Sequence, residues 1–451
     1  MCSFIITNFQ IENLDYINFY NKRRGPDYTS VHESNGVTFV HNLLSITGEF
    51  KKQPFVDGNI VCLYNGEIYN YKDFGFKALS DGEVLIPLYK KYGKDFLKHI
   101  DGEFAVVLYD FQSKEIIAGT DVFATKPLWF GNIDDSRYCI SSYESVLKRS
   151  GAKDTRKLEA NKTIVWEMDT FKIKHSQENK KFDISNQYKT SYDDCLHSFS
   201  SSIQKRSKDL REKIFIGLSS GYDSGTIACA LMNHGVDFKS YSIRAQENLD
   251  IIDERHRILL EHQQEVEKIF LTKEQFSNEK KHIKEFCEEF LYQIKRGAKV
   301  TPNEYMTNDK GAIGLAFICS VAKSEGIKIY FSGQGADEIF SDYGYAGRKI
   351  YNHSTFGGKY PNDLREVFPW NSFYQSTQLS YLAKEENISG CYGIEGRYPF
   401  LDFDLVQEFL WLSPELKNKN YKSVLYEYMK TNCFPFEENK KIGFSCDVGL
   451  R

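Results

Sequence analysis

Short runs of β-branched and aromatic residues, separated by Gly, Asp and Asn, fill the first 150 residues of the chain. Each run is compatible with a short strand: SFIITNF, GVTFVHNL, GNIVCLYNGEIYN, GEFAVVLYDF, KEIIAGT and YCISSY. Residues 83–92 differ, because their apolar positions favour a helix. Many short strands at this spacing predict a sandwich of sheets over residues 1–150.

The pattern changes to helical periodicity near residue 192. Three apolar runs interrupt it, and each is compatible with a buried strand: KIFIGL, FKSYSIR and IKIYF. Strands that alternate with helices predict a parallel, doubly wound α/β sheet over residues 191–451. Between the two regions, residues 151–190 are polar and contain one strand-like run, KTIVWEMD, so we expect a linker there.

Composition narrows the class of protein. A chain of 451 residues predicts two domains, with three as the alternative. A hydrophobic content of 41% and a net charge of -4 are typical of a soluble globular protein and give no reason to expect a nucleic-acid partner. No apolar run reaches membrane-spanning length, and the start MCSFIITNFQ lacks the features of a signal peptide. We therefore expect a cytoplasmic protein without a membrane partner.

Ten cysteines are scattered along the chain without a CxxC pair. Most lie in apolar runs, which predicts reduced, buried thiols and not zinc sites or disulfides. Cys2 differs because of its position. Removal of the initiator Met1 would give it a free α-amine, which can act as the base for its own thiol. A cysteine at position 2 is weak support alone, so its interpretation depends on the other motifs.

The run KIFIGL leads into SSGYDSG and then into a helical segment, TIACALMNHG. A strand, a Ser/Gly loop and a helix N-terminus bring N–H groups and a helix dipole to one point, which favours an anion such as phosphate. The Walker pattern GxxxxGK[ST] is absent, so a P-loop kinase or ATPase is disfavoured. Ser219, Gly221, Asp223 and Ser224 match the SGGxDS loop of ATP pyrophosphatases, and Ser220 stands where that loop has Gly. An ordinary strand-to-helix turn is the alternative.

A second motif, SGQGADEIF, follows the run IKIYF. Loops after parallel strands meet at one edge of a sheet, so we expect Ser332 and Gly333 to join the same nucleotide site. Acidic groups near phosphates make sense mainly with a divalent cation between them, so Asp223 and Asp337 are the candidate Mg²⁺ ligands. A surface turn with solvated carboxylates is the alternative.

Eight motifs, in order, resemble those of glutamine-dependent asparagine synthetases: MCSF, RRGPD (23–27), NGEIYN (65–70), SDGEV (80–84), SSGYDS, SGQGADEIF, GIEGRYPFLD (393–402) and KKIGFSCDVG. The resemblance covers nearly the whole chain. It implies an α+β glutaminase sandwich of the N-terminal nucleophile type, followed by an α/β ATP-pyrophosphatase domain. ATP and Mg²⁺ would be its cofactors, and a homodimer is compatible with the resemblance.

In the first domain, the resemblance implies that Cys2 attacks the side-chain amide of glutamine. Asn65 and the N–H of Gly66 would stabilise the tetrahedral oxyanion. Glu67 and Asp81 would hold the α-amine of glutamine. For the NGE sequence, an Asn-Gly hairpin turn between strands is the alternative.

The first domain also departs from the family sequence. HERLSI in the family is HNLLSI here, so Leu44 replaces an Arg that pairs with the glutamine carboxylate. Loss of a bidentate Arg should weaken glutamine binding. Arg24 is the candidate that could bind the glutamine carboxylate in place of the missing Arg.

The second domain departs from the family at its acceptor pocket. Gln334 stands where the family has a Glu thought to handle the proton of ammonia, and glutamine cannot accept a proton at neutral pH. The stretch TNDKGAIGLAFICS lacks the Arg-Ala-Ser-Thr-Pro run associated with aspartate and offers Lys310 instead. Lys441, aligned through KKIGFS, is the candidate catalytic lysine that stabilises developing charge. A solvated lysine at a helix end is the alternative.

The resemblance implies a glutamine-dependent amidotransferase. Ammonia from glutamine would pass through an internal channel to a carboxylate activated as an acyl-adenylate, with release of pyrophosphate and then AMP. The acceptor would be aspartate or a larger carboxylate such as a sugar uronate.

Three alternatives stay open. The first is an ordinary asparagine synthetase that acts on aspartate. The second is a ligase that uses an amine within its own substrate, against which Cys2 argues. The third is a catalytically reduced binding or regulatory protein, suggested by Leu44, Ser220 and Gln334.

Overall fold

The computed structural model describes residues 2–243, 247–296, 299–300, 305–444 and 446. Met1, Ser445 and residues 447–449 of the last motif therefore lie outside the described residues. The chain divides into two compact units. The N-terminal unit comprises Met1–Lys181, Asp209–Arg211 and Gly390–Glu395, and the C-terminal unit comprises Phe182–Lys208, Glu212–Ser389 and Gly396–Arg451.

Two six-stranded sheets form the N-terminal unit, and their described pairings are antiparallel. The first sheet has the order β10 (Arg156–Lys157), β8 (Trp129–Asn132), β9 (Tyr138–Ser141), β1 (Ser3–Thr7), β3 (Val37–Leu43) and β2 (Tyr28–Ser34). The second has the order β12 (Ile173–Glu178), β11 (Lys162–Glu167), β7 (Glu115–Thr120), β6 (Gly102–Asp110), β5 (Ile60–Ile68) and β4 (Phe55–Asp57). The sandwich predicted from the strand pattern is confirmed.

The linker predicted over residues 151–190 is corrected by these sheets. Strands β10, β11 and β12 lie within that stretch and pair with strands from the first 150 residues. The N-terminal unit therefore continues to Lys181. The polar character of the stretch misled the prediction because β12 is an edge strand whose side chains are mostly exposed.

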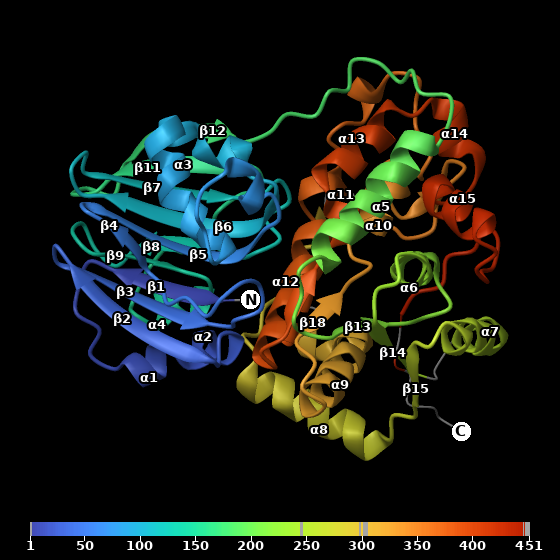
Figure 1. The fold of residues 1–451 in the computed structure, drawn as a ribbon, viewed down its shortest axis with the longest axis horizontal. Helices are drawn as coiled ribbons and strands as arrows, with labels where there is room; N and C mark the ends of the chain where they lie inside the picture. The colour runs from blue at the N-terminus through green and yellow to red at the C-terminus, as the bar shows by residue number, and fades with distance from the viewer. Residues whose placement is uncertain (1, 244–246, 297–298, 301–304, 445, 447–451) are drawn as a thin grey trace. The chain divides into compact units, whose positions relative to one another are not determined.

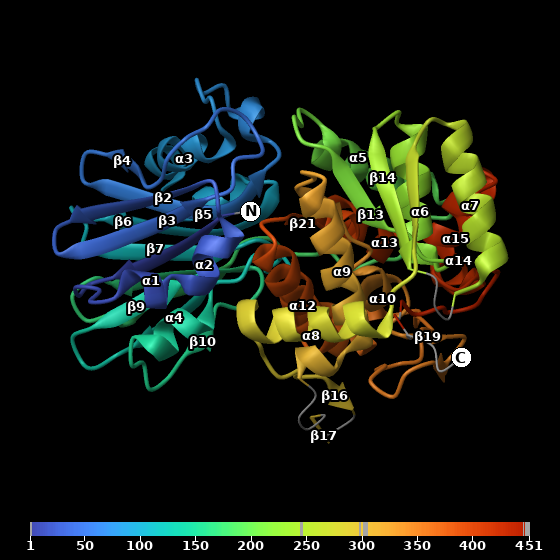
Figure 2. The ribbon, with the colours of Figure 1, turned by 90° about the horizontal axis from the view of Figure 1, so that it is seen from below.

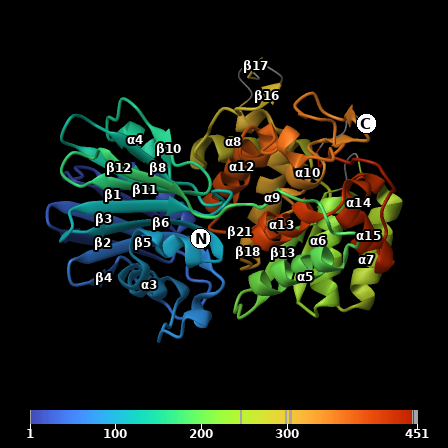
Figure 3. The same ribbon diagram turned by 90° about the horizontal axis from the view of Figure 1, so that it is seen from above.

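Alternation of side chains along the strands explains the layers. Phe4 and Ile6 of β1 pack with Val61 and Leu63 of β5 in a core between the two sheets. Ile5 instead contributes to a core on the outer face of the first sheet, which also contains side chains of α4 (Glu144–Arg149). The outer face of the second sheet packs against α3 (Leu85–Tyr92). Figure 3 shows α4 and α3 on opposite outer sides of the strand layers.

The remaining helical segments of the N-terminal unit are short: α1 (Leu14–Ile17), α2 (Phe19–Arg24), and the 3-10 turns η1 (Tyr71–Phe74), η2 (Asp81–Val84) and η3 (Gly93–His99). The helix predicted over residues 83–92 is thus split between η2 and α3. Pro87 lies in the first turn of α3, where its missing N–H would be unpaired in any case.

A five-stranded sheet forms the centre of the C-terminal unit. Its order is β15 (Glu265–Ile269), β14 (Phe238–Ile243), β13 (Ile214–Gly217), β18 (Ile329–Phe331) and β21 (Glu395–Arg397). Strands β13, β14, β15 and β18 pair in parallel, as predicted, and Figure 2 shows β13 and β14 side by side. The chain proceeds from β13 outward to β15 and returns to place β18 on the other side of β13. The strand order therefore reverses between β13 and β18, the position where open α/β sheets bind ligands.

Helices surround this sheet in the ribbon of Figure 1. Among them, α6 and α9 contact β13. Their bounds are α5 (Asp193–Ser207), α6 (Tyr222–Asn233), α7 (Leu249–Glu261), α8 (Lys273–Phe286), η4 (Met306–Asn308), α9 (Lys310–Ser324), α10 (Ala336–Phe340), η5 (Leu364–Glu366), α11 (Asn371–Tyr374), α12 (Thr377–Cys391), η6 (Pro399–Leu401), α13 (Phe403–Trp411), α14 (Pro414–Lys419) and α15 (Ser423–Thr431). Two short ribbons join β16 (Lys295–Arg296) to β17 (Lys299–Val300) and β19 (Gly344–Tyr345) to β20 (Arg348–Lys349). In the described part of the chain, no helix is long and apolar enough to cross a membrane.

Candidate functional site

The thiol of Cys2 lies buried at the start of β1, with 7% of the residue exposed. Its Sγ lies 3.8 Å from the carbonyl oxygen of Leu44. Burial raises the pKa of the Cys2 thiol to about 11, and the carboxylates of Glu395 and Asp81 contribute to the rise. The thiol therefore needs a base before it can act as a nucleophile.

Asn65 belongs to β5 and follows Val61 and Leu63 in the alternation that faces the core between the sheets. The side chain is fully buried, and neither its Oδ1 nor its Nδ2 has a hydrogen-bond partner among the described residues. A buried amide without partners costs on the order of 1 to 3 kcal/mol for each unpaired group. Such a group is a candidate for binding a ligand.

Gly66 continues β5, with Asn65 opposite Ala105 and Gly66 opposite Phe104 of β6. The hairpin turn considered for NGE is therefore wrong. Gly66 has a φ of +139°, and a Cβ at this position would lie 1.9 Å from the carbonyl oxygen of Glu103. Only glycine fits this close approach of two strands.

The structure brings Glu67 and Asp81 together. Both are buried, and the Asp81 carboxylate accepts hydrogen bonds of 2.9 Å from the N–H groups of Ile68 and Gly82. Burial raises the pKa of Asp81 to about 6 in spite of these bonds. Two carboxylates thus lie at the end of β5 that carries Asn65 and Gly66.

Arg24 is fully buried, and its Nε donates a 2.9 Å hydrogen bond to the carbonyl oxygen of Cys2. Its guanidinium carbon lies 5.7 Å from the centre of the Tyr143 ring. Arg24 therefore holds the backbone of Cys2 in place, a contact that the sequence did not predict. Its predicted role toward the glutamine carboxylate stays a prediction.

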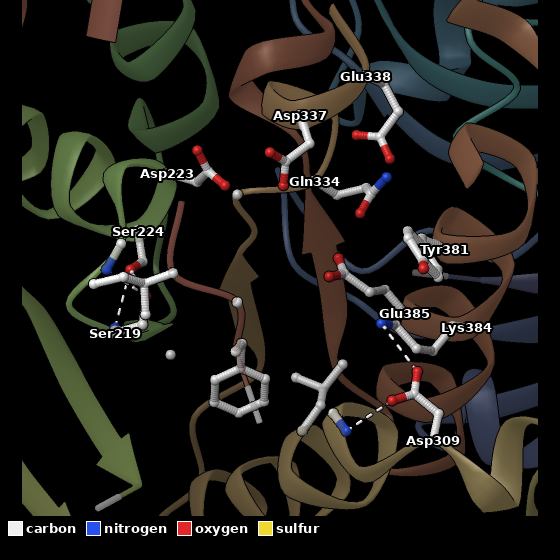
Figure 4. A pocket seen from close by; sticks show the side chains of 18 of the residues that line it. Ser219, Asp223, Ser224, Asp309, Gln334, Asp337, Glu338, Tyr381, Lys384 and Glu385 are labelled. Carbon is white, nitrogen blue, oxygen red and sulfur yellow. Dashed lines mark hydrogen bonds and ion pairs between the residues drawn. The ribbon is translucent and has the colours of Figure 1, made fainter. Parts of the chain in front are cut away.

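The second centre is a cavity of about 280 Å³ at the carboxyl ends of β13 and β18 (Figure 4). Both predicted loops line it. The loop after β13 and the start of α6 contribute Ser219, Gly221, Asp223 and Ser224, and the loop after β18 with the start of α10 contributes Gly333, Gln334, Asp337 and Glu338. The predicted meeting of the two motifs at one sheet edge is therefore seen.

The loop after β13 is fixed by side-chain hydrogen bonds. The N–H of Ser219 donates to Oγ of Ser224 at 3.0 Å, and the two hydroxyl oxygens lie 2.8 Å apart. Arg255 of α7 donates to the carbonyl oxygens of Ser219 and Gly221. A Cβ on Gly225 would lie 2.4 Å from Nη2 of Arg255, so this glycine makes room for the guanidinium.

Two predicted nucleotide-binding side chains do not line the cavity. Ser220 donates through its N–H at 2.8 Å and through its hydroxyl to Glu247. The hydroxyl of Ser332 donates to Glu385 and accepts from the N–H of Gln334 at 3.0 Å. Both serines therefore stabilise the loops through hydrogen bonds and do not line the cavity. Motif matching could not show this, because it gives the position of a residue and not the direction of its side chain.

Two lysines bridge Asp223 and Asp337. Nζ of Lys422 lies 2.5 Å from Oδ1 of Asp223 and 2.7 Å from Oδ1 of Asp337. Lys441 binds Oδ2 of Asp337 and lies 3.9 Å from Oδ2 of Asp223. Burial would raise the pKa of Asp337, but the two ammonium groups outweigh it and hold that pKa well below its usual range. Lys441 is therefore not a solvated lysine, and Lys422 was missed because no motif marks it.

The pair of carboxylates fits a divalent cation. Asp223 and Asp337 converge closely enough to share one ammonium group, and carboxylate oxygens are the protein ligands that Mg²⁺ prefers. The described residues contain no group of three or more His, Cys, Asp or Glu side chains that could hold a metal. Phosphate or water oxygens would have to complete the coordination, which is usual for Mg²⁺.

The assignment of Lys310 to the acceptor site is corrected by the structure. It is exposed at the first position of α9 and is not among the residues that line the cavity. Its neighbour Asp309 lines the cavity instead, caps α9 by accepting from the N–H of Gly311 at 2.8 Å, and lies 3.4 Å from Nζ of Lys384. The lysine at this end of the cavity is therefore Lys384, from α12.

Glu338 and Glu385 lie on either side of Gln334 in Figure 4. Burial raises the pKa of each carboxyl group to about 7. Glu385 accepts from Ser332, and Glu338 accepts from the hydroxyl of Tyr343 while its Oε2 has no partner among the described residues. Glu385 was missed because it lies in a helix without a motif.

The fold has the organisation of a glutamine amidotransferase domain with antiparallel sheets, followed by a synthetase domain with a parallel sheet. The glutamine amidotransferase domain family matches residues 1–184, and the asparagine synthase family matches residues 197–379. The chain belongs to the family of glutamine-dependent asparagine synthetases, which are ATP-dependent ligases with glutamine as amido donor.

Named relatives agree with this family. Glutamine-hydrolysing asparagine synthetase 2 of Oryza sativa is 26% identical over 452 residues, which cover 92% of this chain and 69% of that protein. Glutamine-hydrolysing asparagine synthetase 1 of Saccharomyces cerevisiae is 25% identical and covers 88% of this chain and 72% of that protein. A solved glutamine phosphoribosylpyrophosphate amidotransferase from B. subtilis covers 81% of this chain and 79% of that one, at 13% identity. The TM-score of this match is 0.33.

Proposed function

We propose that this chain hydrolyses glutamine at Cys2 and uses the ammonia to amidate a carboxylate that ATP has activated as an acyl-adenylate. The observation that carries the proposal is the cluster of Asp223, Asp337, Lys422 and Lys441 between the loops after β13 and β18. Two acids and two lysines, next to a helix N-terminus, suit a phosphate chain with its cation.

In the first step, Sγ of Cys2 attacks the amide carbon of glutamine. The base is the α-amine that Cys2 would carry after removal of Met1. The amide group of Asn65 has no partner among the described residues, so in this proposal it donates to the oxyanion together with the N–H of Gly66. Ammonia leaves, and water then hydrolyses the thioester to glutamate and the free thiol.

The buried carboxylates of Glu67 and Asp81 bind the α-amine of glutamine in this proposal. Arg24 keeps the reacting thiol in position through the Cys2 carbonyl. Position by position, the Arg of HERLSI corresponds to Leu43 of HNLLSI and not to Leu44, so the predicted replacement is corrected by one residue. The side chain of Leu43 offers no charge to the glutamine carboxylate. Glutamine binding should therefore be weaker than an arginine at this position would give.

In the second step, an oxygen of the acceptor carboxylate attacks the α-phosphorus of ATP, and pyrophosphate leaves. Ser219, Gly221, Ser224 and Gly333 would contact the nucleotide, and Asp223 and Asp337 would hold Mg²⁺. The bound cation would supply charge neutralisation at the phosphate oxygens. Lys441 and Lys422 would add positive charge at the same oxygens once the carboxylates turn to the metal.

In the third step, ammonia attacks the acyl carbon, AMP leaves, and one proton must be removed from nitrogen. Gln334 cannot take this proton. We assign it to Glu385, because its carboxylate lies in the cavity next to Gln334 and a pKa of about 7 suits a base at neutral pH. In this proposal the base lies on α12 and not in the loop after β18.

Aspartate is the second candidate acceptor, favoured by the names of the relatives and by Lys384, which could bind its α-carboxylate. A direct test measures ATP–pyrophosphate exchange with a panel of carboxylic acids. Exchange that depends on one acid supports adenylation. Release of ADP and phosphate, or an absence of exchange with every acid, would overturn the proposed function.

A further inference from the structure

A second cavity, of about 350 Å³, adjoins the first within the C-terminal unit. It shares four lining residues with the first cavity: Asp309, Tyr351, His353 and Tyr381. Its other lining residues are Tyr292, Ile294, Ile350 and Asn352. The two cavities therefore adjoin each other at the four shared residues.

Aromatic rings dominate the second cavity. Tyr351 and His353 stack with centroids 5.4 Å apart and an angle of 13° between their planes. On another wall, Tyr292 meets Tyr381 edge to face at 5.9 Å. Tyr343 packs edge-on against His353 at 4.4 Å and against Tyr351 at 5.7 Å, so the stacked pair is held before any ligand binds.

Polar groups accompany these rings. Oδ2 of Asp309 accepts from the hydroxyl of Tyr292 at 2.7 Å and lies 3.4 Å from Nζ of Lys384. Burial would raise the pKa of Asp309, but Lys384 and Tyr292 lower it, so the group is an ionised acceptor at neutral pH. Asn352 adds an amide to the same cavity.

This combination suits a ring that carries several hydroxyl groups. The C–H faces of a sugar ring pack on aromatic faces, and its hydroxyls donate to carboxylate and amide oxygens. Aspartate has four carbons, and its carboxyl groups are needed near the adenylation centre, so it would leave the second cavity empty. A purely aromatic acid has no hydroxyl groups for the Asp309 carboxylate or the Asn352 amide, so it would make fewer polar contacts in this cavity.

We propose that the second cavity binds the ring of a hexuronate acceptor, with its carboxylate directed past Lys384 into the first cavity. This inference rests on the proposed function, because it names the acid that ATP activates. Tyr351 is the main specificity residue, since it lines both cavities and belongs to the stacked pair.

The test compares a methyl hexuronate glycoside, aspartate and phenylacetate in ATP–pyrophosphate exchange. We expect saturable exchange with the hexuronate. Tyr351→Ala should raise its KM at least tenfold and change the KM for ATP by a much smaller factor, and Tyr351→Phe should retain most of the affinity. Tyr188→Ala is the matched control, because Tyr188 is exposed and lines neither cavity.

A second measurement separates the two proposals. Calorimetric titration of the glycoside into the protein without ATP reports binding of the acceptor separately from its adenylation. Binding that Tyr351→Ala removes supports the inference even if no acid gives exchange, a result that would overturn the proposed function only. Efficient exchange with aspartate that Tyr351→Ala leaves unchanged, together with no binding of the glycoside, would overturn the inference and leave adenylation standing.

Discussion

The two candidate centres differ in how their polar groups are held before a ligand binds. In the N-terminal unit, the amide of Asn65 is buried with no partner in the part of the chain that the structure describes, and burial raises the pKa of the Cys2 thiol, which favours its neutral form. In the C-terminal unit, Asp223 and Asp337 are already paired with two lysines. The first centre is thus prepared for a neutral amide, which needs donors that are not engaged elsewhere.

The second centre has a different task. Its ligand is expected to bring a phosphate chain and a cation, so the site needs both lysines and carboxylates. Until the ligand binds, these charges pair with one another, because an unpaired buried ion is unfavourable. In the proposed reaction, contacts with phosphate and metal would replace the lysine–aspartate pairs. An unpaired buried polar group can therefore indicate a site for a neutral ligand, and a cluster of paired charges can indicate a site for a charged ligand.

The strongest way to separate the two centres is Cys2→Ala. We expect glutamine-dependent amide formation to be abolished, because the nucleophile is lost, while formation with an ammonium salt stays within about twofold, since the two centres are independent. Amide product is measured with each nitrogen donor. Cys433→Ala, at an exposed cysteine, is the control. Equal losses with both donors would contradict the division into two centres.

The charge cluster gives the next largest effect. Asp337→Asn removes one of two carboxylates and should lower pyrophosphate release at least about 100-fold with either nitrogen donor, because Mg²⁺ and Lys441 both lose a partner. Glutaminase activity, read as glutamate release, should persist. Asp363→Asn removes a surface charge that forms an ion pair with Arg365, and it should change neither activity. If glutamate release fell as much as pyrophosphate release, the two centres would not be independent.

Glu385→Gln sharpens the comparison inside the second centre. We expect amide formation from ammonia to fall about 100-fold, as for loss of a general base, while ATP–pyrophosphate exchange stays unchanged. Burial raises the pKa of Glu385 to about 7, and only the ionised form accepts a proton. At constant free ammonia, the wild-type rate should rise from about pH 6 to about pH 8, and the variant should lack this limb.

Two further variants decide whether Glu385 is the base. Gln334→Glu in the Glu385→Gln background returns a carboxylate to the neighbouring loop and should restore part of the rate. Glu338→Gln is the matched comparison, because burial raises the pKa of Glu338 to a similar value. If Glu338→Gln removes the pH limb and Glu385→Gln does not, the assignment belongs to Glu338.

Much of the fold could be predicted from the sequence, because alternation and helical periodicity are local. The strands around Cys2 and Asn65 and the parallel order of β13 and β18 follow from such patterns. The exposed strand β12 was missed, since a polar edge strand resembles a linker. For the sites, the motifs placed the two loops at one sheet edge.

The direction of individual side chains could not be predicted. Lys422 lies in a left-handed backbone conformation before α15, and Glu385 lies on α12, far along the chain from both loops. Nothing local in the sequence marks either residue. Lys310 and Asp309 are adjacent, yet the N-cap role of Asp309 brings its carboxylate to the cavity while Lys310 is exposed. These outcomes depend on tertiary packing.

The smallest expected effect concerns Ser220, the residue that departs from the family loop. Its hydroxyl binds Glu247 and does not line the cavity, so Ser220→Gly should restore the family sequence and change the KM for ATP by less than about threefold. The lost hydrogen bond should lower the free energy of unfolding by about 1 kcal/mol, which thermal denaturation can detect. Ser224→Gly is the contrasting variant, because Ser224 lines the cavity and bonds Ser219. A tenfold change in KM for Ser220→Gly, with no change in stability, would mean that Ser220 contacts the nucleotide after all.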